Sequence, residues 1–358
     1  MIRERADILV VGLGPAGASA AAEAARRGCK VLAVDRKREP GRPVQCAEFV
    51  PAMIGTASGV LAASVRQPID AMVTYVEDDA PDVKPHFPGY MLDRAAFDAA
   101  LVSAAQRAGA RCVFGTGVRS IGPDGRVGLT DGTIVAAQVV VGGDGPRSVV
   151  GRAIGQVNRQ LVETRQITVP LRERHAATDI FLSAGIPGGY GWLFPKAEVA
   201  NLGAGVDPAY KARLKSIVSR LHAHLIESGR VGAKILELTG GAIPVGGMLR
   251  PVGQLGNALI LLAGDAAGLA NPVTGAGIAA AVHSGRFAGE AAANHVAGMS
   301  TAAADYEEEI ESLFKAALDR ALNRRAELAA AMDAGTFPDK AQLRRGWIAY
   351  PQYWSASL

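Results

Sequence analysis

The chain has 358 residues, enough for two domains or one large one, and its hydrophobic content of 49% excludes an intrinsically disordered protein. Its net charge of +4 comes from dispersed basic residues rather than a basic stripe, so no nucleic-acid partner is expected. The three cysteines lack metal-ligand and disulfide spacing, so we expect no metal site and a reducing, cytoplasmic setting. No apolar run reaches the roughly 18 residues of a membrane span.

The N-terminus carries a dinucleotide-binding pattern. Residues 6–11, ADILVV, predict a strand, and the following GLGPAG is a G-x-G-x-x-G that leads into an alanine-rich helix. Residues 30–35 predict the next strand, which ends in an acidic side chain placed to bond a ribose hydroxyl. The glycines allow the backbone to turn tightly and to approach a pyrophosphate, which the helix N-terminus stabilises. The predicted cofactor contacts of this region are Gly12, Gly14, Ala16, Gly17 and Asp35.

A helix is predicted over residues 91–109. Arg94, Phe97 and Leu101 follow one another at i, i+3 and i+7, so they share one face of that helix. An exposed helix arginine satisfies the same spacing, and the pattern alone does not separate this alternative from a cofactor contact.

Two later segments place an acidic residue at the end of a strand. Residues 139–155, VVVGGDGPRSVVGRAIG, indicate strand, Gly-Asp-Gly and helix, and taken alone they favour a turn with a capped helix. Residues 257–285 indicate a strand, a Gly-Asp pair and then two glycines that open another helix. A carboxylate at that strand end can bond a ribityl hydroxyl, while backbone N–H groups face a flavin ring edge. The predicted cofactor contacts in these segments are Asp144, Asp265, Gly275, Gly277 and Ile278.

Residues 189–196, GYGWLFPK, predict a strand with an aromatic row formed by Tyr190, Trp192 and Phe194. Side chains at every second position of a strand share one face. The row therefore forms either a core layer of a second domain or the wall of a cavity, and periodicity does not choose between them.

The C-terminal region, 301–358, is predicted to be helical. Residues 304–332 form one long amphipathic pattern, which favours a solvated helix packed on a domain over a membrane-surface element. Residues 344–354 carry the other two tryptophans, and a position beside a lipid-binding opening is the weaker interpretation of them.

The three glycine-containing segments, in this order and spacing, resemble the FAD-binding fold shared by aromatic hydroxylases, flavin halogenases and geranylgeranyl reductases. The resemblance runs from residue 6 to about residue 290. It implies FAD as the cofactor, because NAD-only dehydrogenases lack the Gly-Asp segment at this distance. It also implies that Arg94, in its R-x-x-F-D setting, reaches the flavin, and it adds Val118 to the expected cofactor contacts.

Two motifs favour the reductases among these relatives. Aromatic hydroxylases commonly have Gly-Asp-Ala-Ala-His where this chain has GDAAG at 264–268, and its continuation NPVTGAGI at 271–278 resembles the reductase form. Halogenases carry Trp-x-Trp-x-Ile-Pro where this chain has YGWLFP at 190–195, which is similar to the Tyr-x-Trp-x-Phe-Pro-Lys of geranylgeranyl reductases. The resemblance implies that the row of Tyr190, Trp192 and Phe194 binds an isoprenoid chain, which has no polar groups and must be held by apolar contact.

The reductases also place a cysteine in a loop near the flavin, and the segment RPVQCAEFVP at 42–51 matches it. Cys46 takes that position and Ala47 follows, so the resemblance makes both cofactor contacts and makes Cys46 the candidate catalytic residue. Cys46 either donates a proton to the substrate or only shapes the pocket, and a lone cysteine is often just a small buried hydrophobe. In the family, glycine often follows this alanine, whereas this chain has Glu48 and then Phe49. The shape of the loop and the exact substrate can therefore differ from those of the family.

The expected fold class is α/β, with a Rossmann-like FAD-binding domain, a β-sheet substrate domain and a C-terminal helical segment. The FAD-binding domain is expected to be discontinuous, and the predicted ranges are 1–65, 90–155 and 247–300 for that domain, 66–89 and 156–246 for the substrate domain, and 301–358 for the helical segment.

The predicted function is an FAD-dependent reductase that saturates carbon–carbon double bonds of a geranylgeranyl-type isoprenoid chain by hydride transfer from reduced flavin. The alternative is an FAD-dependent monooxygenase, hydroxylase-like or halogenase-like, that acts on an aromatic or protein side-chain substrate, with His175, His222 and His224 as candidate polar partners. The electron donor stays open between NADPH, a reduced ferredoxin-like protein and a quinol, because no second nucleotide-binding pattern marks an NADPH site. The lipid substrate is compatible with peripheral contact to a membrane.

Overall fold

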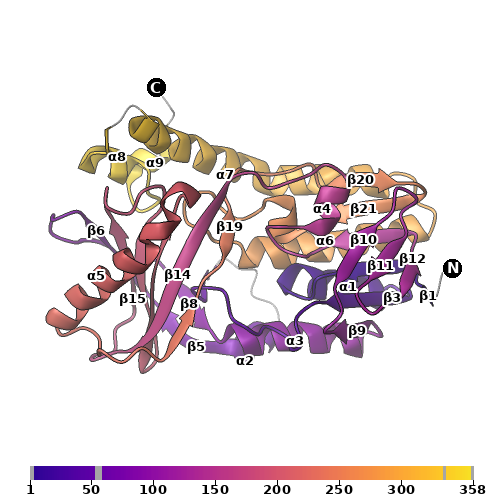
Figure 1. Ribbon diagram of the computed structural model, residues 1–358, viewed down its shortest axis with the longest axis horizontal. Helices are drawn as coiled ribbons and strands as arrows, with labels where there is room; N and C mark the ends of the chain where they lie inside the picture. Colours follow the sequence, from indigo (N-terminus) through magenta and orange to yellow (C-terminus); the bar gives the residue numbers. More distant parts are fainter. Residues whose placement is uncertain (1–3, 53–58, 334–335, 356–358) are drawn as a thin grey trace.

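A computed structural model describes residues 4–52, 59–333 and 336–355 of the chain. Its elements form two halves along the long axis of the molecule, one built on a mostly parallel sheet and the other on a mostly antiparallel sheet, and helix α7 (Ala302–Asp333) runs along both (Figure 1). The predicted fold class, α/β with a Rossmann-like domain, a β-sheet domain and a C-terminal helical segment, is confirmed.

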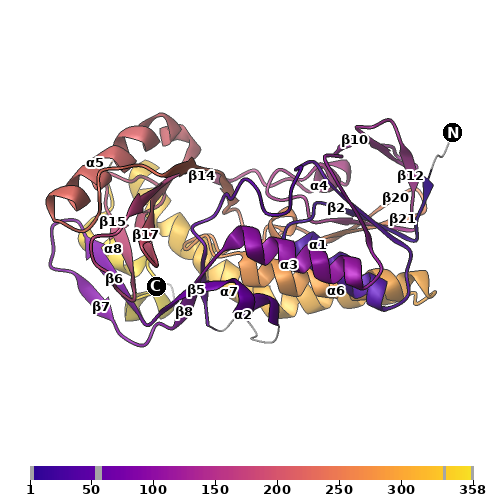
Figure 2. The same ribbon diagram turned by 90° about the horizontal axis from the view of Figure 1, so that it is seen from below.

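The sheet of the first half has the strand order β20–β21–β13–β2–β3–β9, in which β20 is an antiparallel edge strand and the others run parallel. The strands read as unbroken apolar runs, such as ILVV and ALILL, because both faces of the sheet are covered. Helices α1, α3 and α6 lie on one face and a four-stranded sheet lies on the other (Figure 2). The bounds are β1 (Glu4–Arg5), β2 (Ile8–Val11), α1 (Pro15–Arg26), β3 (Val31–Asp35), α3 (Arg94–Arg107), β9 (Arg111–Phe114), β10 (Val118–Ile121), β11 (Val127–Leu129), β12 (Ile134–Ala136), β13 (Val139–Gly142), α4 (Val149–Ala153), β20 (Val252–Leu255), β21 (Ala258–Leu262), η2 (Gly264–Ala267) and α6 (Ile278–Val296).

Helices α1 and α6 pack with their backbones in direct contact. A Cβ atom added to Gly285 would lie 2.1 Å from the carbonyl oxygen of Ala16, and one added to Gly289 would lie 2.4 Å from that of Ala20. Only glycine permits this approach, which sets the N-terminal ends of the two helices beside the same space.

The second half is an eight-stranded sheet with the order β18–β14–β17–β16–β15–β6–β7, and β19 pairs with β14. Helix α5 covers one face, where Leu193 packs with Leu214 and Ile217. Trp192 and Phe194 lie on the opposite face, as the alternation along the strand requires. The bounds are β6 (Ala71–Val76), β7 (Asp82–Lys84), β14 (Leu161–Pro170), β15 (Ala177–Leu182), β16 (Gly191–Lys196), β17 (Val199–Val206), η1 (Pro208–Arg213), α5 (Leu214–Glu227), β18 (Glu237–Thr239) and β19 (Ala242–Pro244).

A three-stranded sheet, β4 (Phe49–Pro51), β8 (Gly89–Leu92) and β5 (Val65–Ile69), lies between the two halves, together with α2 (Gly59–Ser64). The helix predicted over 91–109 is shorter than expected, because its first residues complete strand β8. Asp93 then caps α3 by accepting the N–H of Ala96 at 2.9 Å. Arg94 is consequently the first residue of the helix.

The C-terminal segment connects the two halves. Helix α7 is anchored to the first half, where the Tyr306 hydroxyl donates to the carbonyl oxygen of Leu262 at 2.6 Å. Helices α8 (Lys340–Arg345) and α9 (Pro351–Trp354) return to the second half, where the Trp347 ring lies 4.7 Å from that of Tyr190. Among the helices of the described residues, none combines the length and hydropathy needed to cross a bilayer.

Candidate active site

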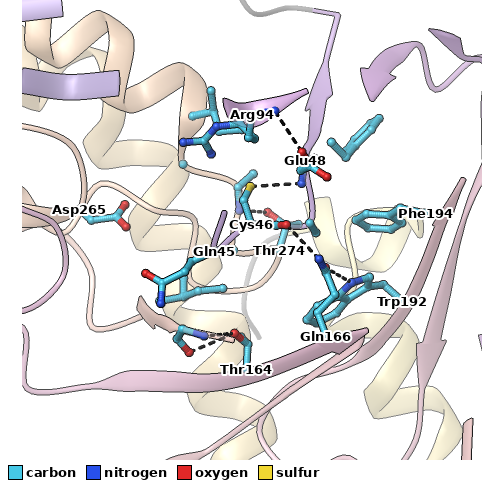
Figure 3. Close-up of a pocket in the computed structure, with 18 of the residues that line it drawn as sticks. Gln45, Cys46, Glu48, Arg94, Thr164, Gln166, Trp192, Phe194, Asp265 and Thr274 are labelled. Atoms are coloured by element: carbon cyan, nitrogen blue, oxygen red, sulfur yellow. Dashed lines mark hydrogen bonds between the residues drawn. The ribbon is translucent and has the colours of Figure 1, made fainter. Parts of the chain in front are cut away.

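A cavity of about 320 Å³ lies between the glycine-rich loops of the first half and the sheet of the second (Figure 3). It brings together segments from both ends and the middle of the chain. The predicted site residues that line it are Gly14, Ala16, Cys46, Ala47, Arg94, Tyr190, Trp192, Phe194, Asp265, Gly275, Gly277 and Ile278. The predicted residues outside this lining are Gly12, Gly17, Asp35, Val118 and Asp144.

The N-termini of α1 and α6 both open onto this cavity. Their N-cap residues are Gly14 and Gly277, and neither helix end has a side-chain cap. The first N–H groups of each helix and its positive dipole end therefore face the cavity and fit the pyrophosphate and an electron-rich ring edge of FAD.

The glycines of the first loop have two different tasks. A Cβ atom on Gly14 would meet nothing within 4 Å, so the space beside it is free for a cofactor. A Cβ on Gly17 would lie 1.8 Å from the carbonyl oxygen of Gly12, so this residue is needed for the turn itself. Gly12 has φ of +89°, a conformation that favours glycine, and its Cβ would lie 2.5 Å from the oxygen of Gly143. The loop therefore fits a bound dinucleotide.

Asp35 and Asp144 have structural partners. The Asp35 carboxylate accepts the backbone N–H groups of Leu13 and Lys37 at 2.7 and 2.8 Å and so fixes the glycine loop. The Asp144 carboxylate accepts the Ser148 hydroxyl at 2.6 Å and backbone N–H groups at the start of α4, which is the capped-helix arrangement that its sequence favours when taken alone. Val118 is half-buried in β10. Cofactor contact by these three residues stays a prediction.

Two oppositely charged side chains, Arg94 and Asp265, lie on the side of the cavity away from the aromatic row (Figure 3). Burial acts to lower the pKa of Arg94, but the Asp98 carboxylate, which it contacts at 3.0 Å, and the sulfur of Cys46 outweigh this and raise it, so the guanidinium stays charged. Burial raises the pKa of Asp265 to about 6, and the charge of Arg94 opposes that rise. This corner of the cavity is suited to polar groups of a flavin.

The cysteine loop enters the cavity between these charges and the aromatic row. The sulfur of Cys46 accepts the backbone N–H of Glu48 at 3.2 Å. The Glu48 carboxylate is buried and accepts the backbone N–H of Arg94 at 3.0 Å, the ammonium of Lys196 at 2.6 Å and the amide of Asn201 at 2.8 Å. The loop is therefore tied to helix α3 and to two strands of the substrate sheet.

Trp192 and Phe194 are buried, Tyr190 is half-buried, and all three rings line the cavity, so the row has features of both a core layer and a cavity wall. Trp192 donates its indole N–H to the Gln166 side chain at 3.0 Å, and Tyr190 donates its hydroxyl to the carbonyl oxygen of Thr274 at 2.6 Å. Tyr190 precedes strand β16 rather than lying in it. These bonds hold the rings in place while their faces form an apolar wall.

Several lining residues were not predicted. Trp347 comes from the C-terminal segment that the sequence linked only weakly to a lipid-binding opening, and it is buried against Tyr190. Strand periodicity in residues 71–76 and 177–182 could have indicated which side chains share the face of the aromatic row, but not that this face borders a cavity. Among the unpredicted lining residues are Met72, Phe87, Gln166, Thr178, Ile180, Trp347 and Ile348.

The Rossmann-like half places two uncapped helix ends and the charged pair Arg94 and Asp265 on one side of the cavity, and the aromatic row forms an apolar wall on the other. This combination is typical of FAD-dependent oxidoreductases. The model of the FAD binding domain matches residues 5–175, and the model of the geranylgeranyl reductase catalytic domain matches residues 162–243. The chain belongs to the geranylgeranyl reductase family, and its cofactor is FAD.

Two relatives with sequence similarity to most of this chain support its membership of the family. The chain is 33% identical over 326 residues to digeranylgeranylglycerophospholipid reductase 2 of Methanosphaera stadtmanae, with 81% of this chain and 78% of that protein covered. It is 36% identical over 345 residues to digeranylgeranylglycerophospholipid reductase 2 of Methanopyrus kandleri, with 87% and 85% covered. The crystal structure of a geranylgeranyl bacteriochlorophyll reductase-like protein of Thermoplasma acidophilum superposes with a TM-score of 0.81 at 25% identity and covers 98% of both chains.

Proposed function

We propose that the protein saturates carbon–carbon double bonds of geranylgeranyl chains carried by a glycerophospholipid. One observation carries the proposal: a single cavity joins two uncapped helix ends, suited to FAD, to an aromatic wall suited to an isoprenoid chain. The names of the relatives, digeranylgeranylglycerophospholipid reductases, support the same lipid class as substrate.

FAD, when bound and reduced, supplies a hydride to one alkene carbon, and the protein must deliver a proton to the other. We propose Cys46 for that proton, because it lines the cavity between the charged corner and the aromatic wall. Tyr190, Trp192 and Phe194 hold the chain in register and keep water away. The hydride and the proton together would add two hydrogen atoms to one double bond, with the two electrons supplied by reduced FAD.

The monooxygenase alternative has less support. Its candidate polar partners do not line the cavity: His222 is buried against the carbonyl oxygen of Gly232 at 3.0 Å, and His175 contacts Asp179 at 3.3 Å. His224 lies on helix α5, which covers the opposite face of the sheet. The curated relatives quoted above are named as reductases.

The electron donor and the membrane contact belong to the same proposal. Either NADPH or a reduced ferredoxin-like protein reduces the flavin, and the enzyme meets its lipid substrate by peripheral contact with a membrane. A phospholipid with two long chains resides in a bilayer, so an enzyme that binds one chain in a cavity must approach that surface.

The test is turnover by dithionite-reduced enzyme under anaerobic conditions with a digeranylgeranylglycerophospholipid. The lipid mass should rise in steps of two units. The Cys46→Ala variant should retain yellow, bound FAD and lose about 100-fold or more in rate, the range of a positioned general acid. A reaction that needs oxygen and adds an oxygen atom would overturn the proposal, and an unchanged rate for Cys46→Ala would assign the proton to another group.

A further inference from the structure

The cysteine loop is bonded to the substrate sheet along its length. Its residues 44–48 belong to no helix or strand, so the loop has no ladder of its own to fix it. Hydrogen bonds to β17, to β18 and to the residue after β18 hold it instead, and the bonded pairs are Thr239 with Val44 at 2.6 Å, Gln45 with Gly240 at 3.0 Å and Asn201 with Ala47 at 3.2 Å. The sheet that carries the aromatic row therefore also sets the place of Cys46.

Gln166 on β14 joins Cys46 to the aromatic row (Figure 3). Its side-chain amide donates to the carbonyl oxygen of Cys46 at 3.1 Å, and its side-chain oxygen accepts the indole N–H of Trp192 at 3.0 Å. Among the described residues, no other hydrogen bond reaches the Cys46 carbonyl. Gln166 is buried, and its strand is paired on both sides, so the bridge starts from a rigid position.

A glycine in the intervening strand makes the bond to Trp192 possible. Trp192, Gly203 and Gln166 lie opposite one another on the neighbouring strands β16, β17 and β14. Neighbouring strands are about 4.8 Å apart, so the indole must cross β17 to reach Gln166. A Cβ atom on Gly203 would lie 2.4 Å from the indole, so the ring lies directly over this glycine. The ring is thus fixed on the sheet both by its face and by its N–H.

We propose that Gln166 is a positioning residue that holds the Cys46 thiol at a set distance from the Trp192 ring. The inference rests on the proposed function, in which the ring binds the isoprenoid chain and the thiol supplies the proton. An isoprenoid chain has no polar group to align it, and a misplacement of about 1 Å between reacting atoms is costly, so the protein must fix donor and wall together. Lining alone would favour an apolar residue, because a buried amide costs free energy unless both of its ends are bonded.

The first test is a double-mutant cycle of Gln166→Met and Cys46→Ala, in FAD-loaded, dithionite-reduced enzyme with a digeranylgeranylglycerophospholipid. Methionine has a similar length and makes neither bond, so kcat should fall about tenfold while KM changes less than about twofold. In the Cys46→Ala background, Gln166→Met should have no further effect on kcat, because it acts through the thiol. Equal slowing in both backgrounds, or a raised KM with an unchanged kcat, would overturn the proposal.

Gln67→Met is the matched control. Gln67 on β5 also bonds through both ends of its amide, since it donates to the carbonyl oxygen of His175 at 2.6 Å and accepts the N–H of Ala197 at 2.8 Å, but it lies outside the cavity lining. It should lower the melting temperature and leave kcat unchanged, and a fall in kcat equal to that of Gln166→Met would count against the proposal.

Gln166→Glu, assayed at about pH 8, is the second variant for the case in which Gln166→Met does not fold. It keeps the size of the side chain and the acceptor for the indole, but a carboxylate cannot donate to the Cys46 carbonyl. Its kcat should fall in the same way, and the fall should again disappear in the Cys46→Ala background.

Alkylation of Cys46 by iodoacetamide in the FAD-loaded enzyme gives a readout that needs no turnover. Gln166→Met should speed it about fivefold, as the loss of one hydrogen bond loosens the loop, while Cys29 and Cys112 serve as internal references and should not change. An unchanged rate at Cys46 would overturn the proposal. If the wild type reduces no isoprenoid lipid, or Cys46→Ala keeps its full rate, the proposed function fails, and the alkylation rate still decides whether Gln166 holds the thiol.

Discussion

Glu48 combines a strained backbone with a well-bonded side chain. Its φ of +71° lies in the left-handed region, which costs a non-glycine residue roughly 1 kcal/mol. Its carboxylate recovers this through the bonds to Arg94, Lys196 and Asn201. Glycine adopts such a conformation without strain, whereas Glu48 is held in it by the polar contacts of its carboxylate. The position of Cys46 depends on this residue, because the N–H of Glu48 bonds its sulfur.

At Trp192, truncation should affect substrate selection more than stability. Trp192→Ala should retain FAD and lose turnover of long prenyl chains more than of short ones, since the lost contact area grows with the chain beside it. Because the ring already borders a cavity, the loss of unfolding free energy should be below the roughly 3–5 kcal/mol typical of a fully packed tryptophan. A thermal melt and a chain-length series measure both effects.

Leu193→Ala is the control on the same strand, since Leu193 faces α5 on the other side of the sheet. It should lower the melting temperature and leave the chain-length preference unchanged. If Trp192→Ala behaves like Leu193→Ala, the aromatic row is only a core layer.

Asp265 should make the stability of the FAD-free protein depend on pH. Its pKa in the folded state is about 6, above the value of roughly 3.9 in an unfolded chain, so folding favours the protonated acid. The contribution of Asp265 to stability is therefore fully present below about pH 4 and is lost as the pH rises through about 6, by up to about 3 kcal/mol. Urea midpoints of wild type and Asp265→Asn between pH 4 and 7 measure this, and curves that run parallel would refute it.

At the scale of elements, the two uncapped helices α1 and α6 define the cofactor site. Their close packing at Gly285 and Gly289 sets both N-termini against one cavity, so two dipole ends act on the same ligand. The substrate sheet contributes through one strand with two different faces. β16 presents its rings to the cavity and Leu193 to α5, so a single strand serves both packing and binding.

Two substitutions in the glycine-rich loop that precedes α1 should have different effects, one on FAD binding and the other on folding. Gly14→Val should abolish FAD binding with a loss of stability of about 1 kcal/mol or less, because an added Cβ atom meets nothing within 4 Å and the side chain would enter the cofactor space. Gly17→Ala should prevent normal folding, because the added atom would overlap the Gly12 backbone. Absorbance of bound flavin and circular dichroism measure the two effects. Retention of FAD by Gly14→Val would contradict the site.

At the scale of the whole molecule, the C-terminal segment closes the cavity and joins the two halves. Arg324 on α7 is buried and bonds the carbonyl oxygens of Tyr353 and Ser355 as well as the Glu327 carboxylate at 2.6 Å. On the substrate side, Arg344 of α8 contacts Asp79 at 2.8 Å. The cavity wall at Trp347 lies between these two attachments and depends on both.

Arg324→Leu should loosen this segment by roughly 3 kcal/mol, because buried carbonyl oxygens lose a charged donor. Trypsin should then cut faster at Lys340 and Arg344, FAD should stay bound, and isoprenoid reduction should fall because the wall at Trp347 opens. Lys315→Leu on the same helix is the control, since Lys315 is exposed and pairs with Asp319. Equal cleavage rates in the two variants would show that Arg324 does not hold the segment.

The sequence by itself determined the FAD-binding half and the strand that carries the aromatic row. Glycine spacing, apolar runs and the alternation of strand with helix are local constraints, so they can be recognised without knowing what packs against them. Gly14, Gly277 and Asp265 were found in this way, and the cavity brings all three together.

Tertiary structure alone decided what surrounds the aromatic row. Lys196 meets Glu48 across 148 positions of sequence, and the indole of Trp347 lies 3.3 Å from the sulfur of Met72 across 275 positions. No local pattern encodes such contacts, because each depends on how separate elements pack. Which polar and apolar side chains surround a site is therefore decided by the packing of the sheets and helices.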